Sequence, residues 1–133
     1  MRRLLSVFLV GVCGTVMACA TTGGIRSAPI TDGVTRAFPG SVQTVLKVAR
    51  ESLVEAGLHI EETNKVDDRT WMVIGRKDAT AFSLGEFVRI VVAQNPGKGS
   101  TVRVLTERRA KINVTAKGDY SDTIFSSMEL KLK

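Results

Sequence analysis

The apolar residues divide the chain into one uninterrupted run near its start and a series of amphipathic segments. The run covers Leu4–Val12 and is followed by small residues up to Cys19. Between residues 41 and 57 the apolar positions instead recur every three or four residues, which predicts an α-helix with one buried face. Those positions are Val42, Val45, Leu46, Ala49, Leu53 and Ala56. Ser41 is a suitable N-cap and Gly57 a suitable left-handed terminator, so we expect the helix to lie between them.

Beyond this helix, four segments show the alternation or the continuous apolar runs that are typical of β-strands. They cover residues 58–63, 70–77, 87–94 and 101–117. In the third segment, we expect Val88, Ile90 and Val92 to point inward and Arg89 to point outward. The last one predicts a long or bulged strand, in which Arg108 marks either the bulge or the end of the core. Residues 77–86 either extend a hairpin or form a loop, and the pattern leaves both open. Residues 34–38 fit a short additional strand.

A second helix is expected at the end of the chain. Asp119 is placed to cap it, and Asp122 in its first turn favours the helix dipole. Its apolar edge consists of Ile124, Phe125, Met128 and Leu132. The order helix, strands, helix with short turns predicts an α+β fold. We expect two layers, with an antiparallel sheet of about four strands and the N-terminal and C-terminal helices on one face.

The first apolar run has the layout of a secretory signal peptide. Arg2 and Arg3 precede it, small residues follow it, and it is short for a membrane span of about 20 residues. It ends in Val16-Met17-Ala18-Cys19, an aliphatic residue, a spacer, a small residue and a cysteine. An ordinary cleaved signal and an uncleaved membrane anchor are the alternatives. In this order, however, the segment resembles the lipobox of bacterial lipoproteins.

That resemblance implies cleavage after Ala18 and attachment of a diacylglycerol to the sulfur of Cys19, with fatty acids such as palmitate. The lipid would anchor the chain to a membrane of the cell envelope. Ala20, rather than aspartate, follows Cys19 and favours the outer membrane, facing the periplasm. Residues 20–31 are rich in Thr, Gly, Ser and Pro without a period, which predicts a flexible tether. The expected organisation is a signal peptide at 1–18, a tether at 19–33 and one α+β domain at 34–133.

Composition narrows the chemistry of the domain. Both cysteines, Cys13 and Cys19, lie in the N-terminal segment, so the sequence predicts neither a disulfide framework nor a thiol-containing zinc site. Without Arg2 and Arg3, 17 basic residues face 13 acidic ones, a mild excess spread along the chain. No dense basic run or pattern of stacking aromatics accompanies it, so we expect no nucleic-acid partner. We also expect no cofactor and no metal.

Several other residues are candidates for a functional site. His59 beside Glu61 fits a solvated strand position better than a catalytic one. Glu61-Glu62 point to opposite faces of a strand and cannot share a proton, and Asp67-Asp68 fit a turn better than a cation site. A single tryptophan in a strand, such as Trp71, is more often a core residue than a contact for a partner. Four outward positions of the last strand are basic and fit either a solvated sheet face or a binding face for anionic headgroups or an acidic partner; they are Arg103, Arg109, Lys111 and Lys117.

Together these segments resemble small bacterial envelope lipoproteins whose domain is of uncharacterised function. The resemblance rests on the helix V-Q-T-V-L-K-V-A-R-E-S-L-V-E-A-G-L, the strands W-M-V-I-G, V-R-I-V-V and T-V-R-V-L, and the closing D-Y-S-D-T-I-F. In outline the order is also similar to helix-grip modules of outer-membrane assembly lipoproteins, an analogy of fold alone. It implies no catalytic residues.

Two functions therefore remain as hypotheses. The first is a non-enzymatic interaction or structural module that binds an envelope protein or a glycan close to the membrane. The second is a small-ligand or lipid-binding domain, with a cavity lined by residues such as Phe82, Phe87 and Phe125. A hydrolase is disfavoured because no recognisable motif combines a nucleophile with a base.

Overall fold

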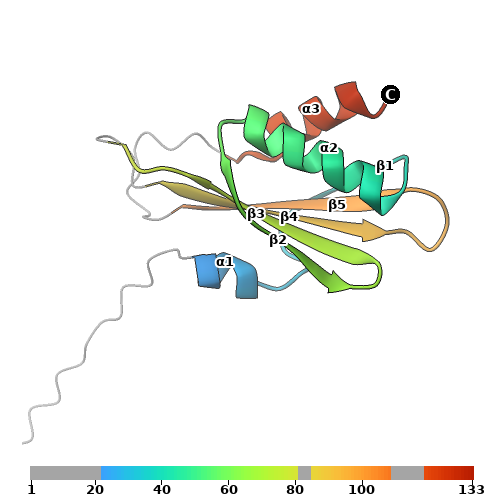
Figure 1. Cartoon of the computed structure of the whole chain (residues 1–133), viewed down its shortest axis with the longest axis horizontal. Helices are drawn as coiled ribbons and strands as arrows, with labels where there is room; N and C mark the ends of the chain where they lie inside the picture. Colours follow the sequence, from blue (N-terminus) through green and yellow to red (C-terminus); the bar gives the residue numbers. More distant parts are fainter. Residues whose placement is uncertain (1–21, 81–84, 109–118) are drawn as a thin grey trace, which may run out of the picture.

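The structure, a computed structural model, describes residues 22–80, 85–108 and 119–133 (Figure 1). In chain order the elements are α1 (Thr22–Ser27), β1 (Val34–Phe38), α2 (Val42–Glu55), β2 (His59–Asp67), β3 (Thr70–Lys77), β4 (Glu86–Gln94), β5 (Ser100–Arg108) and α3 (Ser121–Lys131). The strands form one antiparallel sheet in the order β1-β5-β4-β3-β2. Strands β2 to β5 are thus joined to their neighbours in sequence, and β1 lies at the far edge beside β5.

Helices α2 and α3 cover one face of this sheet (Figure 1). The core between them is built from apolar side chains that are almost fully buried. It includes Val45 and Leu53 from α2, Ile124, Phe125 and Met128 from α3, and Val73, Val88, Ile90, Val92, Val102 and Val104 from the sheet. Gly75 on β3 allows α2 to approach closely, because a Cβ there would lie 2.4 Å from Cδ2 of Leu53.

Helix α1 lies on the opposite face of the sheet (Figure 1). Its Ile25 is completely buried and belongs to a second apolar cluster on that face. The other members are Met72, Ile74, Phe87 and Val91, with Leu105 partly buried beside them. The central strands β3 and β4 are therefore apolar on both faces, which accounts for the continuous apolar runs in their sequences.

The prediction of an α+β domain with an antiparallel sheet is confirmed at that level, and the details differ. The sheet has five strands rather than about four, because residues 34–38 form β1, with Val34 opposite Val104 and Phe38 opposite Ser100. The two predicted helices, α2 and α3, do share a face. The third helix, α1, was not expected, and it places a helix on the other face as well.

Residues 22–33 correct the expectation of a flexible tether. Thr22–Ser27 form a helix whose Ile25 is buried against the sheet. The chain then turns from this face into the sheet edge at Gly33, whose φ is +114°. A Cβ at Gly33 would lie 2.5 Å from the carbonyl oxygen of Val104, so only glycine fits this crossing without displacement.

The predicted helix ends agree well with the structure. The Oγ of Ser41 accepts a hydrogen bond from the backbone N–H of Thr44 at 3.3 Å, and Gly57 has a φ of +88°. At the start of α3, Asp119 accepts a hydrogen bond from the N–H of Ser121 at 2.9 Å, although the N-cap position itself is Tyr120. Asp119 thus satisfies a free N–H of the first turn, as expected.

Two predicted regions extend outside the described residues. The described part of strand β5 reaches Arg108, and the predicted continuation to 117 lies outside the described residues, so the role expected for Arg108 as a bulge or as the end of the core stays a prediction. For the ambiguous stretch 77–86, β3 ends at Lys77 and β4 begins at Glu86, while residues 81–84 are not described.

Candidate functional site

The most unusual side chain of the described domain is the arginine at position 89. Arg89 lies in the middle of β4 and is completely buried under the segment that follows α1. Its guanidinium donates hydrogen bonds to three backbone carbonyl groups: Nη1 to Ile25 at 3.1 Å and to Ala28 at 2.6 Å, and Nη2 to Pro29 at 2.7 Å. A side chain from the central sheet therefore holds the N-terminal segment against the domain.

Pro29 explains why these carbonyls need a donor. In an α-helix the carbonyl of Ile25 would accept the N–H of the residue four positions later. That residue is Pro29, which has no N–H, so the helix ends and the Ile25 carbonyl is left without its usual partner. The Nη1 group of Arg89 takes that place. A positive charge at the C-terminal end of a helix is also favoured by the helix dipole, although α1 is short.

Arg89 is charged, but none of the carboxylates in residues 22–80, 85–108 and 119–133 forms an ion pair with it. Burial lowers the pKa of Arg89, and the negative charges of Asp32 and Glu107 oppose that effect. Its Nε has no hydrogen-bond partner among the described residues. Because desolvating a guanidinium costs several kcal/mol, the three carbonyl hydrogen bonds are needed to keep it buried.

A second contact fixes α1 at the surface. Arg26 forms a two-pronged ion pair with Glu62 on β2, with Nε of Arg26 2.7 Å from Oε1 of Glu62. The hydrogen bond from Arg26 lowers the pKa of Glu62 below its ordinary value. Helix α1 is thus held from the edge strand β2 and from the central strand β4.

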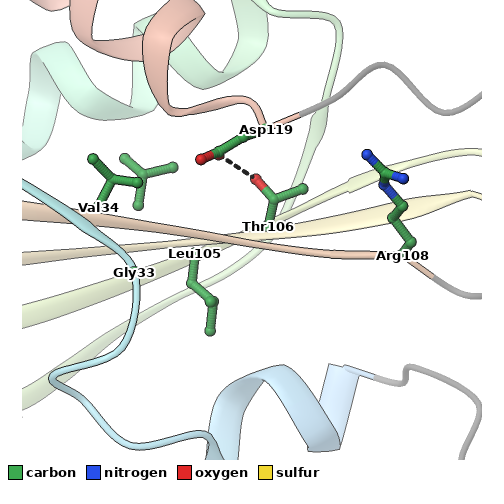
Figure 2. A pocket seen from close by; sticks show the side chains of 7 residues that line it. Gly33, Val34, Leu105, Thr106, Arg108 and Asp119 are labelled. Carbon is green, nitrogen blue, oxygen red and sulfur yellow. Dashed lines mark hydrogen bonds between the residues drawn. The ribbon is translucent and has the colours of Figure 1, made fainter. Parts of the chain in front are cut away.

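A depression of about 260 Å³ lies where β5 extends past the start of β1 towards α3, and Figure 2 shows the side chains around it. Its lining residues are Gly33, Val34, Val104, Leu105, Thr106, Arg108 and Asp119. Thr106 and Arg108 point towards the α3 side and Leu105 points towards α1 (Figure 2). The Thr106 hydroxyl donates to Asp119 at 3.2 Å and accepts from the N–H of Tyr120 at 3.2 Å. These polar groups therefore serve to attach the start of α3 to β5.

Beside this depression, Glu86 and Tyr120 form a buried polar pair. Each is about 1% exposed, and the Tyr120 hydroxyl donates to Oε2 of Glu86 at 2.6 Å. Oε1 of Glu86 has no partner among the described residues. Burial, and then the hydrogen bond to Glu86, raises the pKa of Tyr120 far above its usual value. The pair links the start of β4 to the start of α3.

The residues proposed from the sequence as sites fall into two groups. Cys19, Arg109, Lys111 and Lys117 lie outside the described residues. Arg103 is partly exposed on β5, opposite Val91 and Thr35, and so belongs to the same face as α1. The basic binding face stays a prediction, with one of its four residues placed.

The remaining candidates have ordinary surroundings. His59 is exposed and lies 3.3 Å from Asp78, while Glu61 pairs with Arg76 at 2.9 Å. Asp67 accepts the N–H of Arg69 at 2.7 Å within the β2–β3 turn, as expected for turn chemistry. Trp71 packs partly buried against the core under α2, as a core residue does.

Arg89 points away from Val88, Ile90 and Val92, as expected, but its burial beneath the segment after α1 was not expected. The residues on either side of Arg89 in β4 do indicate that it is buried. Phe87 and Val91 stand two residues away on either side and share its face of the strand. A charged residue between two large apolar residues of the same face indicates a buried position. What contacts it depends on a segment 60 residues earlier, which no local pattern encodes.

Comparison with known proteins adds no assignment: no family model matches the chain, and no curated protein matches it significantly. In the described part of the chain, no three His, Cys, Asp or Glu residues are grouped so as to bind a metal ion. None of the helices in residues 22–80, 85–108 and 119–133 is long and apolar enough to cross a membrane.

Proposed function

We propose that this chain is a lipoprotein of the bacterial cell envelope, lipidated at Cys19, whose domain is a non-enzymatic interaction or structural module. The observation that carries the proposal is the order Val16-Met17-Ala18-Cys19 at the end of an apolar run preceded by Arg2 and Arg3. The acyl chains contribute about 0.8 kcal/mol for each buried methylene, so two or more chains anchor the protein stably. With Ala20 after the cysteine, we place it at the outer membrane, facing the periplasm.

The packing of the domain favours a surface contact over an internal ligand site. Phe87 lies in the cluster beneath α1, whereas Phe125 lies in the cluster beneath α2 and α3, so these two rings do not line one cavity. Phe82 is outside the described residues. A ligand pocket enclosed by these three aromatic residues, as the alternative function supposed, is therefore not supported.

The outer surface of α2 and α3 offers places for a partner. A depression of about 450 Å³ beside α2 is lined by side chains of both charges and two apolar residues; they are Lys47, Arg50, Glu51, Val54, Glu55 and Ile60. Val54 is 54% exposed there, and Leu130 on α3 is 72% exposed. An apolar centre surrounded by a polar rim is the usual arrangement of a protein–protein interface.

Metabolic labelling tests the anchor. Cells expressing the full chain are fed an alkyne-bearing palmitate analogue, and the purified protein is examined for the label. We expect labelling of the wild type and of Cys13→Ala, which alters the other cysteine of the signal segment, and none of Cys19→Ala. Equal labelling of the Cys19→Ala variant would refute lipidation at this residue.

A photo-crosslinking amino acid placed at Val54 or Leu130, in the native envelope, tests the interaction module. We expect adducts with an envelope protein or a glycan that are absent when the same amino acid replaces Ser27 on the opposite face. A tightly bound lipid or small molecule that copurifies with the protein, with no adduct at either position, would favour the ligand-binding alternative instead.

A further inference from the structure

The N-terminal segment defines which side of the domain faces the membrane, if Cys19 carries the lipid. The folded part of the domain begins at Thr22, in a helix that is fixed to the sheet by Ile25 and by the carbonyls that bind Arg89. Only three Cα–Cα steps separate Cys19 from Thr22. Even fully extended, they span at most about 11 Å. The lipidated residue cannot be farther than this from the start of α1.

We propose that the α1 side of the sheet lies directly on the bilayer surface and that α2 and α3 are held away from it. This inference rests on the proposed lipidation of Cys19, and its occupant is the headgroup layer of the membrane that holds the lipid. Helix α1 lies on the sheet face opposite α2 and α3 (Figure 1). Since a helical layer and a sheet are each about 10 Å thick, the axis of α2 lies about 20 Å farther from the membrane than the axis of α1.

The composition of the α1 side suits this contact. Arg103 is partly exposed there on β5, and Arg26 on α1 is exposed although it pairs with Glu62. The segment that follows α1 also exposes 37% of Ile30. An exposed arginine and an exposed aliphatic residue on the same side match the boundary between anionic headgroups and acyl chains. The surface with Val54 and Leu130 then faces the periplasm, where the proposed partner is reached.

The chain offers a convenient way to measure this orientation. Its two cysteines are Cys13, in the proposed signal peptide, and Cys19, whose sulfur carries the proposed lipid. A cysteine introduced elsewhere is then the sole free thiol of the mature lipoprotein. Ser27→Cys on α1 and Lys47→Cys on α2 are both at exposed positions, on opposite sides of the sheet.

The full-length variants are purified from membranes, and mass spectrometry first establishes whether Cys19 is lipidated. Each thiol is then spin-labelled, and the protein is placed in vesicles of phosphatidylethanolamine and phosphatidylglycerol that contain a nickel-chelating lipid. We expect relaxation of the label by nickel to be several-fold stronger at residue 27 than at residue 47. Equal relaxation at the two positions, or stronger relaxation at residue 47, overturns the inference.

A linker insertion provides the matched variant. About 12 Gly and Ser residues inserted between Thr21 and Thr22 add a mean reach of about 20 Å without altering the described fold. This insertion should bring the ratio of the two relaxation effects close to one. The same insertion between Gly97 and Lys98, in the exposed β4–β5 turn, should leave the several-fold difference intact; a loss of the difference there as well overturns the inference.

The outcomes separate the two proposals. Protein without lipid at Cys19 refutes the proposed function and removes the basis of the orientation with it. Lipidated protein that shows no difference between residues 27 and 47 leaves the anchor in place and refutes the orientation alone. Lipidated protein with a strong difference, lost only on insertion before Thr22, supports both.

Discussion

Replacing Arg89 by methionine tests how the N-terminal segment is attached. Methionine has a similar length and fills much of the same volume, but it donates no hydrogen bond. The variant Arg89→Met therefore removes the three hydrogen bonds to the carbonyls of Ile25, Ala28 and Pro29 while preserving most of the packing. We expect the segment 22–33 to detach more readily and the rest of the domain to stay folded.

The size of the effect follows from the contacts. A hydrogen bond from a charged donor contributes roughly 1.5–3 kcal/mol, and leaving a buried acceptor unpaired has a similar cost. Relief from burying the guanidinium offsets part of this loss, since desolvating a charge is itself unfavourable. We therefore expect Arg89→Met to weaken the docking of the segment by about 3 kcal/mol. A domain of ordinary stability, about 5–15 kcal/mol, survives such a change.

Hydrogen exchange on the chain without its signal segment measures the local effect. Two backbone amides report on the attached segment. The N–H of Ala28 donates to the carbonyl of Gly24, and the N–H of Asp32 donates to the carbonyl of Pro29. Since each 1.4 kcal/mol corresponds to a factor of ten, we expect both to exchange about a hundredfold faster in Arg89→Met. Amides of β3 and β4 should change much less.

Arg103→Met is the matched control, because it removes a positive charge from the same face at a partly exposed position. It should leave the exchange of Ala28 and Asp32 unchanged. Pro29→Ala provides a second check, since alanine restores an N–H that can reach the carbonyl of Ile25, and it should lessen the effect of Arg89→Met. Unaltered exchange of Ala28 and Asp32 in Arg89→Met would refute the role assigned to the arginine.

Three further predictions concern the rest of the domain. Gly75→Ala should lower the free energy of unfolding, measured by urea denaturation, by about 1–3 kcal/mol, because the new Cβ would overlap the Leu53 side chain. In the double variant with Leu53→Ala, the combined loss should be smaller than the sum of the two single losses. Gly33→Ala should cost at least as much and should raise exchange in β1, since its Cβ would meet backbone rather than a flexible side chain. Tyr120 is the single tyrosine, so its absorbance near 295 nm reports one group. Burial and the hydrogen bond to Glu86 raise the pKa of Tyr120 in the folded domain. The protonated Tyr120 hydroxyl therefore contributes its full share of stability below about pH 10, the ordinary pKa of tyrosine, and this share is lost as the pH rises further. Tyrosinate should form only as the domain unfolds; its appearance near pH 10 in folded protein would contradict the buried pair, and Tyr120→Phe should reduce the alkaline loss of stability.

The elements that could be predicted are those whose pattern is repeated along the sequence. Helix α2 presents six apolar residues at helical spacing with Ser41 and Gly57 at its ends, so local information defines it completely. The bounds expected for β3, residues 70–77, are those observed, because polar turn residues precede it and its apolar run is continuous. In both cases the burial of the element follows from its own composition.

Helix α1 could not be predicted because nothing in T-G-G-I-R-S favours a helix. Two glycines lower its intrinsic stability, and six residues are too few for a helix to be stable by itself. It forms because Ile25 fills the apolar cluster on β3 and β4, and because Arg89 satisfies the carbonyls at its end. Both contacts join residues more than 45 positions apart, so no window of the sequence contains them. The unexpected burial of Arg89 has the same origin.

The contacts of residues 22–33 also change the meaning of the predicted anchor. A flexible linker that only connects an anchor to a domain needs no contact with that domain, and its sequence tolerates change. This segment instead has a buried isoleucine, a proline that frees a carbonyl, a buried arginine that binds that carbonyl, and a glycine that fits beneath a backbone oxygen. Each of these constrains the direction in which the chain leaves the domain. If Cys19 carries a lipid, the same contacts determine the orientation of the sheet above the membrane, so Arg89, far from the cysteine in sequence, controls how the anchored domain is presented.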